Sequence, residues 1–345
     1  MMEGKDSFTV AVDAMGGDFA PREIVKGAIR AAQENGHKIL LVGDESALEV
    51  ELSNYEVGKL DIIVVASEGV IEETDNPIRA IKEKPYASVV QAARLVKSGD
   101  AHAFVTMGST GAAMAAATLE MGLLDNIDRP AIGGPLFGGL SRTVFGGLSR
   151  TVLMDLGSNV DCRPSRLLGF AALGVAFARV IQGIENPRVG ILSVGSEEGK
   201  GNRQTKEAYP LFKESNLNFI GNVEGMDILL DKADVVVCDG FVGNILMKYT
   251  EGLGMALLKH MPDLLGASLP AEISAQISKK LVEMTSPAEV GGGGPLFGIN
   301  GTAIVGHGRA NGENVAQAII MAENVVKGGL IEAMSKELAA LNQLG

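Results

Sequence analysis

The sequence predicts a doubly wound α/β fold, in which mostly parallel strands alternate with helices. Three short apolar runs, at 8–13, 38–43 and 61–66, are separated by segments with helical periodicity at 22–35 and 46–52. This βαβαβ order is typical of a parallel sheet covered by helices. The composition agrees, since 46% of the residues are hydrophobic, 4% are aromatic and 45 are glycine. Such an aliphatic core suits close packing of helices on a sheet.

Size and charge limit the possible functions. A chain of 345 residues exceeds the ~250–300 residues at which single cores stop growing, so we expect two intertwined units or one large one. The net charge of −12 argues against a nucleic-acid partner, which needs a basic face. Cys162 and Cys238 lie in or beside apolar strands and fit buried, inert thiols. A polar start and the lack of an apolar run of ~18 residues predict a cytoplasmic protein, bound at most to a membrane surface.

Two glycine-containing loops follow strands in the first third of the chain. The first strand ends at Asp13, and Gly16 and Gly17 come next, before a helix over 22–35 that Gly36 closes. This loop lacks the spacing of a dinucleotide-binding fingerprint. Segment 72–86 is expected to be a loop with one short helix, followed by a helix over 88–98 and a strand over 101–106. Ser109, Thr110 and Gly111 then begin a small-residue turn whose N–H groups could contact an anion, or which could simply allow tight packing.

The middle of the chain contains a tandem repeat and two further polar loops. The octapeptide FGGLSRTV occurs at 137–144 and again at 145–152, and we expect the surplus copy to form an exposed loop. A strand over 151–156 leads into a loop that contains Asn159, and a helix is expected over 164–181. A strand over 189–195 leads into a loop with Lys200 and Asn202. A helix over 205–215 and a strand over 218–225 complete this part.

The strongest single pattern is the stretch 233–248. Val235–Val237 predicts a buried strand, Asp239 stands at its carboxyl end, and Gly240 and Gly243 mark a turn. Asn244 is placed as the N-cap of the next helix. Free N–H groups at a helix N-terminus favour binding of an anion, although an ordinary βα turn has the same pattern.

Two helices, over 245–261 and 269–284, follow this turn and are joined by an apolar link. Such a helical hairpin could contact a lipid surface or pack in a dimer. The last part predicts a strand over 302–305, then His307 between two glycines, and a helix over 314–326. His307 is accessible enough to act as an acid, a base or a phosphate donor, or is a plain surface residue.

Because carboxyl ends of parallel strands meet along one edge, these loops are expected to form one site. It is rich in N–H, Asn, Ser and Thr groups, a composition that binds phosphate and stabilises an oxyanion. The sequence shows no Ser-His-Asp set, reactive Cys motif or metal-ligand cluster. Inorganic phosphate could therefore serve as the nucleophile itself.

Taken in order, these loops resemble the bacterial phosphate acyltransferase family, which makes acyl phosphate from acyl-acyl-carrier-protein for phospholipid synthesis. The matching motifs are VDAMGGD at 12–18, GSTGA at 108–112, RPA at 129–131, DLGSN at 155–159, NPRVG at 186–190, EEGKGN at 197–202, FIGNVEG at 219–225, DGFVGN at 239–244 and GHG at 306–308. The duplicated octapeptide departs from the family, as does the hexapeptide GGPLFG at 133–138, which recurs at 293–298.

The resemblance implies a three-layer α/β/α sandwich with a mostly parallel mixed sheet, similar to isocitrate and isopropylmalate dehydrogenases, with a protruding helical hairpin at 245–284. It implies one intertwined unit, with subdomain one at roughly 1–125 plus 295–345 and subdomain two at roughly 126–294. It also implies a homodimer that associates peripherally with the inner face of the membrane, and no cofactor or metal.

The reaction implied is attack of inorganic phosphate on the thioester of acyl carrier protein. Lys200 and Asn244 are expected to hold the phosphate or the oxyanion, and His307 to protonate the leaving thiolate. Further substrate or phosphate contacts are expected from Asp13, Gly16, Gly17, Ser109, Thr110, Gly111, Asn159, Asn202, Asp239 and Gly243. A local basic face for the acidic carrier protein is sought among Arg79, Lys82, Lys84, Arg203, Lys279 and Lys280. The alternatives are a metal- and NAD-dependent dehydrogenase of similar fold and a non-catalytic scaffold on a membrane surface.

Overall fold

The computed structural model describes residues 8–136, 151–265, 270–286 and 290–341. The chain divides into two compact units. Unit 1 comprises Met1–Leu124 and Gly291–Ile331, and unit 2 comprises Asp125–Val290 and Glu332–Gly345. Most of the duplicated octapeptide, residues 137–150, lies outside the described residues.

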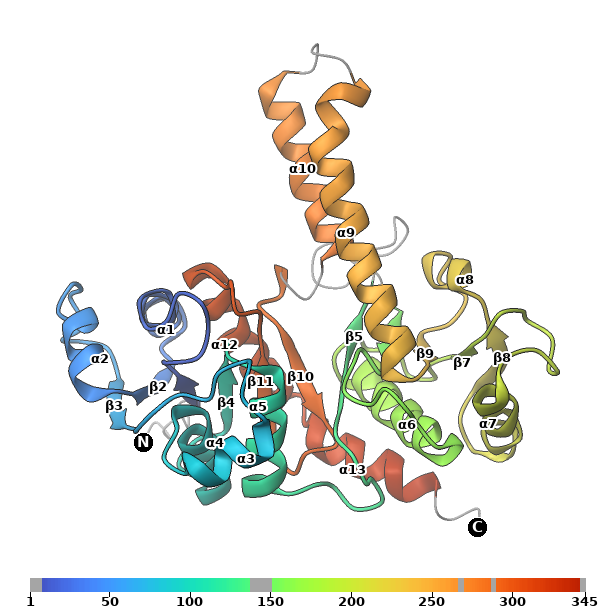
Figure 1. Ribbon diagram of the computed structural model, residues 1–345, viewed down its shortest axis with the longest axis horizontal. Helices are drawn as coiled ribbons and strands as arrows, with labels where there is room; N and C mark the ends of the chain where they lie inside the picture. Colours follow the sequence, from blue (N-terminus) through green and yellow to red (C-terminus); the bar gives the residue numbers. More distant parts are fainter. Residues whose placement is uncertain (1–7, 137–150, 266–269, 287–289, 342–345) are drawn as a thin grey trace, which may run out of the picture. The chain divides into compact units, whose positions relative to one another are not determined.

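Unit 1 is built on a largely parallel sheet (Figure 1). Its strands are β1 (Thr9–Asp13), β2 (Lys38–Gly43), β3 (Ile62–Ala66), β4 (Ala103–Thr106), β10 (Gly294–Phe297) and β11 (Thr302–Val305). They lie in the order β3-β2-β1-β4-β11-β10, and β10 runs antiparallel to β11. The central strand β1 is buried along its whole length, with Val12 in register with Leu41 on one side and Val105 on the other. The parallel order brings the ends of β1, β4 and β11 to one edge.

The helices of unit 1 pack on this sheet and on one another. They are α1 (Arg22–Asn35), α2 (Glu45–Leu52), α3 (Pro77–Glu83), α4 (Ser88–Ser98), α5 (Thr110–Ala116), the π-helix η1 (Ala117–Met121) and α12 (Gly312–Lys327). The apolar face of α1 packs against α12, where a Cβ on Gly27 would lie 2.5 Å from the Gly312 carbonyl oxygen. Gly36 ends α1 in the left-handed conformation, with φ of 70°, as its sequence position predicts.

Unit 2 also contains a run of mostly parallel strands. Its strands are β5 (Ala131–Pro135), β6 (Val152–Met154), β7 (Val189–Leu192), β8 (Phe219–Val223) and β9 (Val235–Val237), in the order β5-β6-β9-β7-β8. Strand β5 is antiparallel to β6, and the other pairs are parallel. The predicted α/β class with mostly parallel strands is therefore confirmed.

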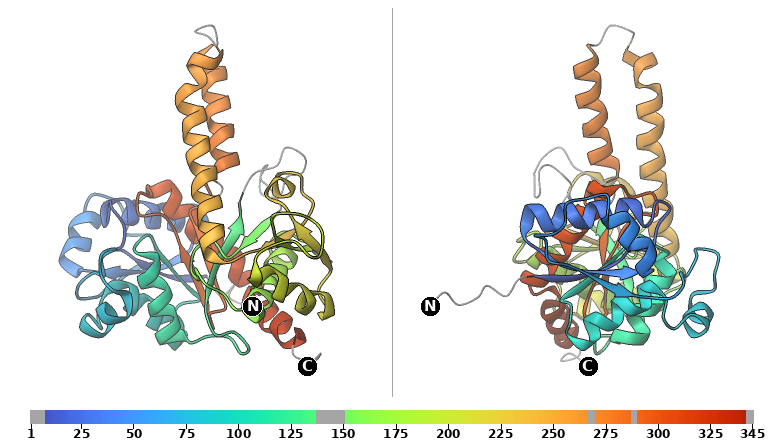
Figure 2. Two further views of the ribbon diagram at one scale, coloured as in Figure 1. Left: turned by 45° about the vertical axis from the view of Figure 1, so that its right-hand side comes forward. Right: turned by 90° about the vertical axis from the view of Figure 1, so that its left-hand side faces the viewer.

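The helices of unit 2 are α6 (Pro164–Val180), α7 (Arg203–Glu214), α8 (Gly225–Leu229), α9 (Gly240–Leu265), α10 (Ala271–Thr285) and most of α13 (Leu330–Leu341). Helix α6 is apolar around most of its surface and packs on β6 and β9. Helices α9 and α10 lie side by side (Figure 2), and a Cβ on Gly254 would come within 2.0 Å of the Thr285 hydroxyl oxygen.

Five elements differ clearly from the expectation. Strands β5 and β10 and helices α8 and α13 were not predicted, and α9 begins at Gly240 instead of Ile245. Residues 332–345 are predicted to belong to the first subdomain, but residues from Glu332 onward group with unit 2. The reason is visible at Glu337, which is almost fully buried and pairs with Arg179 of α6.

Candidate active site

In unit 1, Asp13 lies at the end of β1 beneath the predicted loops. Its side chain is buried, the Thr106 hydroxyl donates to it at 2.6 Å, and the Met15 N–H donates to it at 3.2 Å. Burial raises the pKa of the Asp13 carboxyl, and hydrogen bonds from Ser88 and Thr106 oppose that rise. Asp13 is thus occupied by groups of the protein and organises the loop from below.

The loop after β1 packs closely against the loops after β4 and β11. A Cβ on Gly16 would lie 2.5 Å from the Asp13 carboxylate and 2.9 Å from the Gly108 nitrogen, so only glycine fits there. Gly17 has φ of +111°, and the Asp18 N–H donates to the Gly308 carbonyl at 2.7 Å. This contact brings half-buried His307 to the same edge of the unit 1 sheet.

The loop after β4 presents small hydroxyl groups. Ser109 caps α5, with its hydroxyl accepting the Ala112 N–H at 3.4 Å. Thr110 is exposed at the first helical position, and Gly111 packs against Pro77. Unit 1 therefore brings together the predicted residues Asp13, Gly16, Gly17, Ser109, Thr110, Gly111 and His307.

In unit 2, the corresponding buried carboxylate is Asp155, at the end of β6. It accepts the N–H groups of Gly157 (3.1 Å), Ser158 (3.1 Å) and Asn159 (2.7 Å). Asp155 is not among the site residues predicted from the sequence. It carries the same signal as Asp13, an aspartate at a strand end shortly before a glycine, and that signal could have found it.

Asn159 is also occupied within the protein. Its side-chain N–H groups donate to Asp155 and to the Pro130 carbonyl, both at 2.9 Å, and its own carbonyl accepts the Gly240 N–H at 2.7 Å. The backbone N–H groups of 157–159 and the Asn159 amide are therefore turned toward Asp155. The expected cradle of free N–H groups is not formed at this loop.

The start of α9 corrects the predicted helix cap. Asp239 is the capping residue, because its carboxylate accepts the Val242 N–H at 2.9 Å and its carbonyl accepts the Gly243 N–H at 3.0 Å. Asn244 therefore lies within the first turns of α9 and is not the N-cap. Its side chain is exposed and lies against Gly157, where a Cβ would be 3.3 Å from the Asn244 Cβ. In the part of the chain that the structure describes, the Asn244 amide has no hydrogen-bond partner.

Lys200 lies on the loop after β7. Its side chain is exposed, and its ammonium group has no ion-pair partner among the described residues. The loop is fixed at both ends. The Asn222 amide donates to the Glu197 carbonyl at 2.8 Å, and Asn202 caps α7 by accepting the Thr205 N–H at 2.9 Å.

Helix α7 ties this loop to the loop after β6. The Gln204 amide donates to the Cys162 carbonyl at 2.6 Å. Because β6, β9 and β7 are neighbours in the sheet, unit 2 brings together Asn159, Lys200, Asn202, Asp239, Gly243 and Asn244.

The two cysteines are near this edge but are poor nucleophiles. Burial raises the pKa of the Cys238 thiol well above its usual value, and the nearby Asp239 carboxylate adds to the effect. Cys162 is only half-buried, which differs from the expected full burial. Burial, followed by the charge of Asp155, raises its pKa to about 11.

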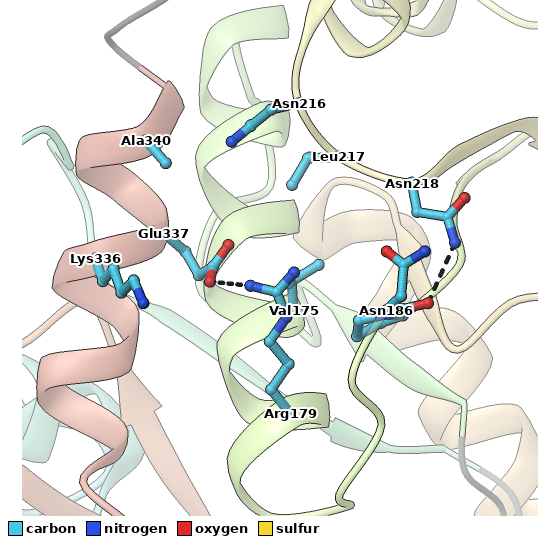
Figure 3. A pocket seen from close by; sticks show the side chains of 10 residues that line it. Val175, Arg179, Asn186, Asn216, Leu217, Asn218, Lys336, Glu337 and Ala340 are labelled. Carbon is cyan, nitrogen blue, oxygen red and sulfur yellow. Dashed lines mark hydrogen bonds and ion pairs between the residues drawn. The ribbon is translucent and has the colours of Figure 1, made fainter.

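A separate hollow of about 210 Å³ lies at the opposite, amino-terminal edge of the unit 2 sheet (Figure 3). Arg179 and Glu337 form an ion pair across it, and Asn218 donates to the Asn186 carbonyl at 3.2 Å. Glu337 neutralises Arg179, and the Asn186 side chain is exposed. We therefore assign no ligand to this hollow. Across the described ranges there is no group of three or more His, Cys, Asp or Glu residues arranged to hold a metal ion. A search of the same ranges finds no helix with the length and apolar content needed to cross a membrane.

Comparison with known proteins identifies the family. A family model described as "Fatty acid synthesis protein" matches residues 8–333. The chain belongs to this family. A relative from Pelotomaculum thermopropionicum, named phosphate acyltransferase, is 44% identical over 340 residues, which cover 97% of this chain and 96% of the relative. The resemblance inferred from the ordered motifs is thus confirmed.

Solved structures of other proteins have a similar fold, although their sequence identity to this chain is low. A phosphotransacetylase from Streptococcus pyogenes matches with a TM-score of 0.56 at 15% identity, covering 97% of this chain and 95% of its own. A 4-hydroxythreonine-4-phosphate dehydrogenase from Klebsiella pneumoniae matches with a TM-score of 0.52 at 14% identity, covering 93% and 99%. The second match is a dehydrogenase, though a different one from the two expected, and at these identities the likeness concerns the fold alone.

Proposed function

We propose that this chain transfers a fatty acyl group from the thioester of acyl carrier protein to inorganic phosphate, giving acyl phosphate for phospholipid synthesis. The observation that carries the proposal is the 44% identity, over nearly the whole chain, to a relative named phosphate acyltransferase. The matched region covers 97% of this chain and 96% of the relative.

The availability of two side chains supports specific roles. Lys200 and Asn244 are exposed, and neither has a partner within the described residues. An ammonium group and an amide donor suit a phosphate anion and the oxyanion of a tetrahedral intermediate. We assign both to this task. A phosphate oxygen attacks the thioester carbonyl carbon, the C–S bond breaks, and the thiolate leaves with a proton for which His307 is the candidate donor.

Other predicted residues receive indirect roles. Asn202 and Asp239 cap the helices that carry or adjoin the site, and Gly243 allows α9 to approach β6. Ser109, Thr110 and Gly111 remain candidate phosphate contacts in unit 1, where Asp13, Gly16 and Gly17 shape the neighbouring loop. Asn159 has its amide hydrogens engaged within the protein and is assigned a supporting role.

Docking of acyl carrier protein is part of the proposal. Among the six basic candidates, Arg79, Lys84 and Arg203 are paired with acidic neighbours. Lys82 and Lys279 are exposed and keep their charge available. An acidic carrier protein would be attracted to such positions, and its association should weaken as salt increases.

We further propose that α9 and α10 form a projecting hairpin, over 245–284, used for homodimerisation and contact with the inner face of the cytoplasmic membrane. Five apolar side chains spaced four residues apart on α9 are exposed: Phe241, Ile245, Tyr249, Leu253 and Leu257. A contiguous apolar stripe of this kind favours burial against another surface.

The reaction is tested by measuring thiol release from palmitoyl-acyl carrier protein with and without inorganic phosphate. Release that requires phosphate and yields acyl phosphate supports the proposal. Release that is independent of phosphate would indicate a thioesterase, and no release by folded protein would reject this substrate pair.

A further inference from the structure

The loop after β6 is shaped by one fully buried carboxylate, that of Asp155. Besides the three backbone N–H groups of 157–159, it accepts the Ser158 hydroxyl at 2.8 Å, the Asn159 amide at 2.9 Å and the Ile132 N–H at 3.3 Å. All six partners are donors. Aspartate fits this position because both of its carboxylate oxygens accept hydrogen bonds. In asparagine an NH₂ group would replace one of these oxygens and would face other hydrogen-bond donors.

The first turn of α9 rests directly on this loop. The Gly240 N–H donates to the Asn159 carbonyl at 2.7 Å, and a Cβ on Gly240 would lie 2.9 Å from the Asn159 nitrogen. Asn244 lies against Gly157 one turn further along. The position of the Asn244 amide therefore depends on the shape that Asp155 gives to 157–159.

We propose that Asp155 is the positioning residue for Asn244 in acyl transfer. The proposal rests on the function proposed above, in which Asn244 donates to the phosphate or the oxyanion. Asp155 is inaccessible to substrate and acts through the loop. The Asp155 carboxylate accepts the N–H groups of 157–159, so these groups are not available to a substrate. The Asn244 side chain is therefore the hydrogen-bond donor that this part of unit 2 can offer. A displacement of ~1 Å in such a group can cost roughly 100-fold in rate.

The test is a double-mutant cycle on the full chain. Asp155→Asn should lower kcat roughly 10- to 100-fold, with little change in KM for phosphate, because a misplaced donor is missed most in the transition state. In an Asn244→Ala background, Asp155→Asn should add little further loss, since both changes remove the same contact. The matched control is Asp234→Asn, another buried carboxylate of unit 2, which bonds Arg188 at 2.9 Å and not the loop. The control should keep kcat per folded molecule.

Two outcomes would overturn the proposal: wild-type kcat in a folded Asp155→Asn variant, or full multiplication of the two single losses in the double variant. If Asp155→Asn does not fold, Ser158→Ala removes one bond to the same carboxylate. Its smaller loss should again vanish in the Asn244→Ala background, and persistence of the loss would count against the proposal.

A readout independent of activity separates this proposal from the proposed function. The side-chain amide NMR signal of Asn244 should shift in Asp155→Asn and stay in place in Asp234→Asn. An unmoved signal in Asp155→Asn rejects positioning, whatever the activity. Wild-type protein without phosphate-dependent thiol release rejects the proposed function, and the NMR comparison still decides whether Asp155 places Asn244.

Discussion

Gly243 lies so close to Asp155 that a Cβ at position 243 would come within 1.8 Å of the Asp155 carbonyl oxygen. This approach lets α9 begin directly over the end of β6. Any side chain at 243 would push the helix, with Asn244, away from the loop that it contacts.

Two glycines on α9 should respond in opposite ways to alanine. Gly243→Ala should lower the free energy of unfolding by ~1–3 kcal/mol and reduce turnover, because the clash is with main-chain atoms. Gly252→Ala should raise stability by ~0.5–1 kcal/mol, since a Cβ there meets nothing within 4 Å. Urea denaturation of both variants checks this, and equal effects at the two positions would contradict the described packing.

Lys200→Ala should reduce phosphate-dependent turnover by at least ~100-fold, because it removes a cation from the proposed phosphate site. The matched control is Lys206→Ala on α7, which removes another exposed lysine close by in the sequence. Steady-state kinetics with varied phosphate measure both. Full activity in Lys200→Ala would remove this residue from the mechanism.

The apolar stripe on α9 should be needed for association. Tyr249→Glu places a charge on the most exposed member of the stripe, which is 68% exposed. We expect this variant to dimerise less, as measured by light scattering, or to bind anionic vesicles less, as measured by flotation. The control is Val50→Glu on α2, an exposed apolar residue of unit 1 outside the stripe. Unchanged association in both assays would leave the stripe without its proposed role.

The buried carboxyl of Asp13 should make stability depend on pH in a defined direction. Its pKa is raised above 3.8, so its contribution is fully present below that pH and is lost as pH rises through the folded-state value. The free energy of unfolding of Asp13→Asn should therefore increase relative to that of the wild type as pH rises from about 4 toward neutrality. Urea denaturation across this range measures the difference, and a constant difference would contradict the prediction.

Asp128 serves as a control, because the pH dependence of its contribution to stability should have the opposite sign. The hydrogen bond from Arg166 lowers the pKa of Asp128, so its stabilising contribution is present above the unfolded pKa and is lost as pH falls. Asp128→Asn should have a lower free energy of unfolding than the wild type at neutral pH, and the difference should shrink as pH falls. The effect should be small because Asp128 is 55% exposed.

Cys162 should react slowly with iodoacetamide despite its partial exposure. With a pKa of about 11, roughly one thiol in a thousand is ionised at pH 8. The alkylation rate, followed by mass spectrometry, should rise about tenfold per pH unit up to pH 10. Rapid modification at pH 7 would show that the thiol is activated. Cys162→Ala should retain turnover.

Periodic apolar patterns predicted most elements, whereas glycine concealed the two antiparallel strands. The helices at 22–35 and 88–98 and the strands at 38–43, 235–237 and 302–305 have the predicted bounds. The hexapeptide GGPLFG is unusual at both of its positions, and its sequence does not predict a strand. In the structure its first copy contributes to β5 and its second to β10, the antiparallel strand of each unit. Glycine and proline have low strand propensity, so local sequence could not reveal strands that neighbouring strands stabilise.

The site residues show a similar division. Asn244 was selected for a capping role that Asp239 fulfils, yet its side chain is exposed and unpartnered among the described residues. Spacing alone could not distinguish Asn159, whose donors are engaged by Asp155 and Pro130, from Asn244. Whether a polar group faces solvent or its own protein depends on contacts between residues far apart in the chain.

The discontinuous make-up of unit 1 has a consequence for synthesis on the ribosome. Strand β4 ends at Thr106, but its partner β11 begins only at Thr302. At about 5–20 residues per second, the intervening stretch of roughly 200 residues takes about 10 to 40 seconds to translate. During that interval β4, whose residues are all buried in the folded unit, has β1 on one side but lacks β11 on the other, and this open sheet edge is a template for aggregation. The larger part of unit 2, Asp125–Val290, is synthesised within the same interval, before unit 1 is complete, whereas its last segment, from Glu332 onward, is synthesised after unit 1.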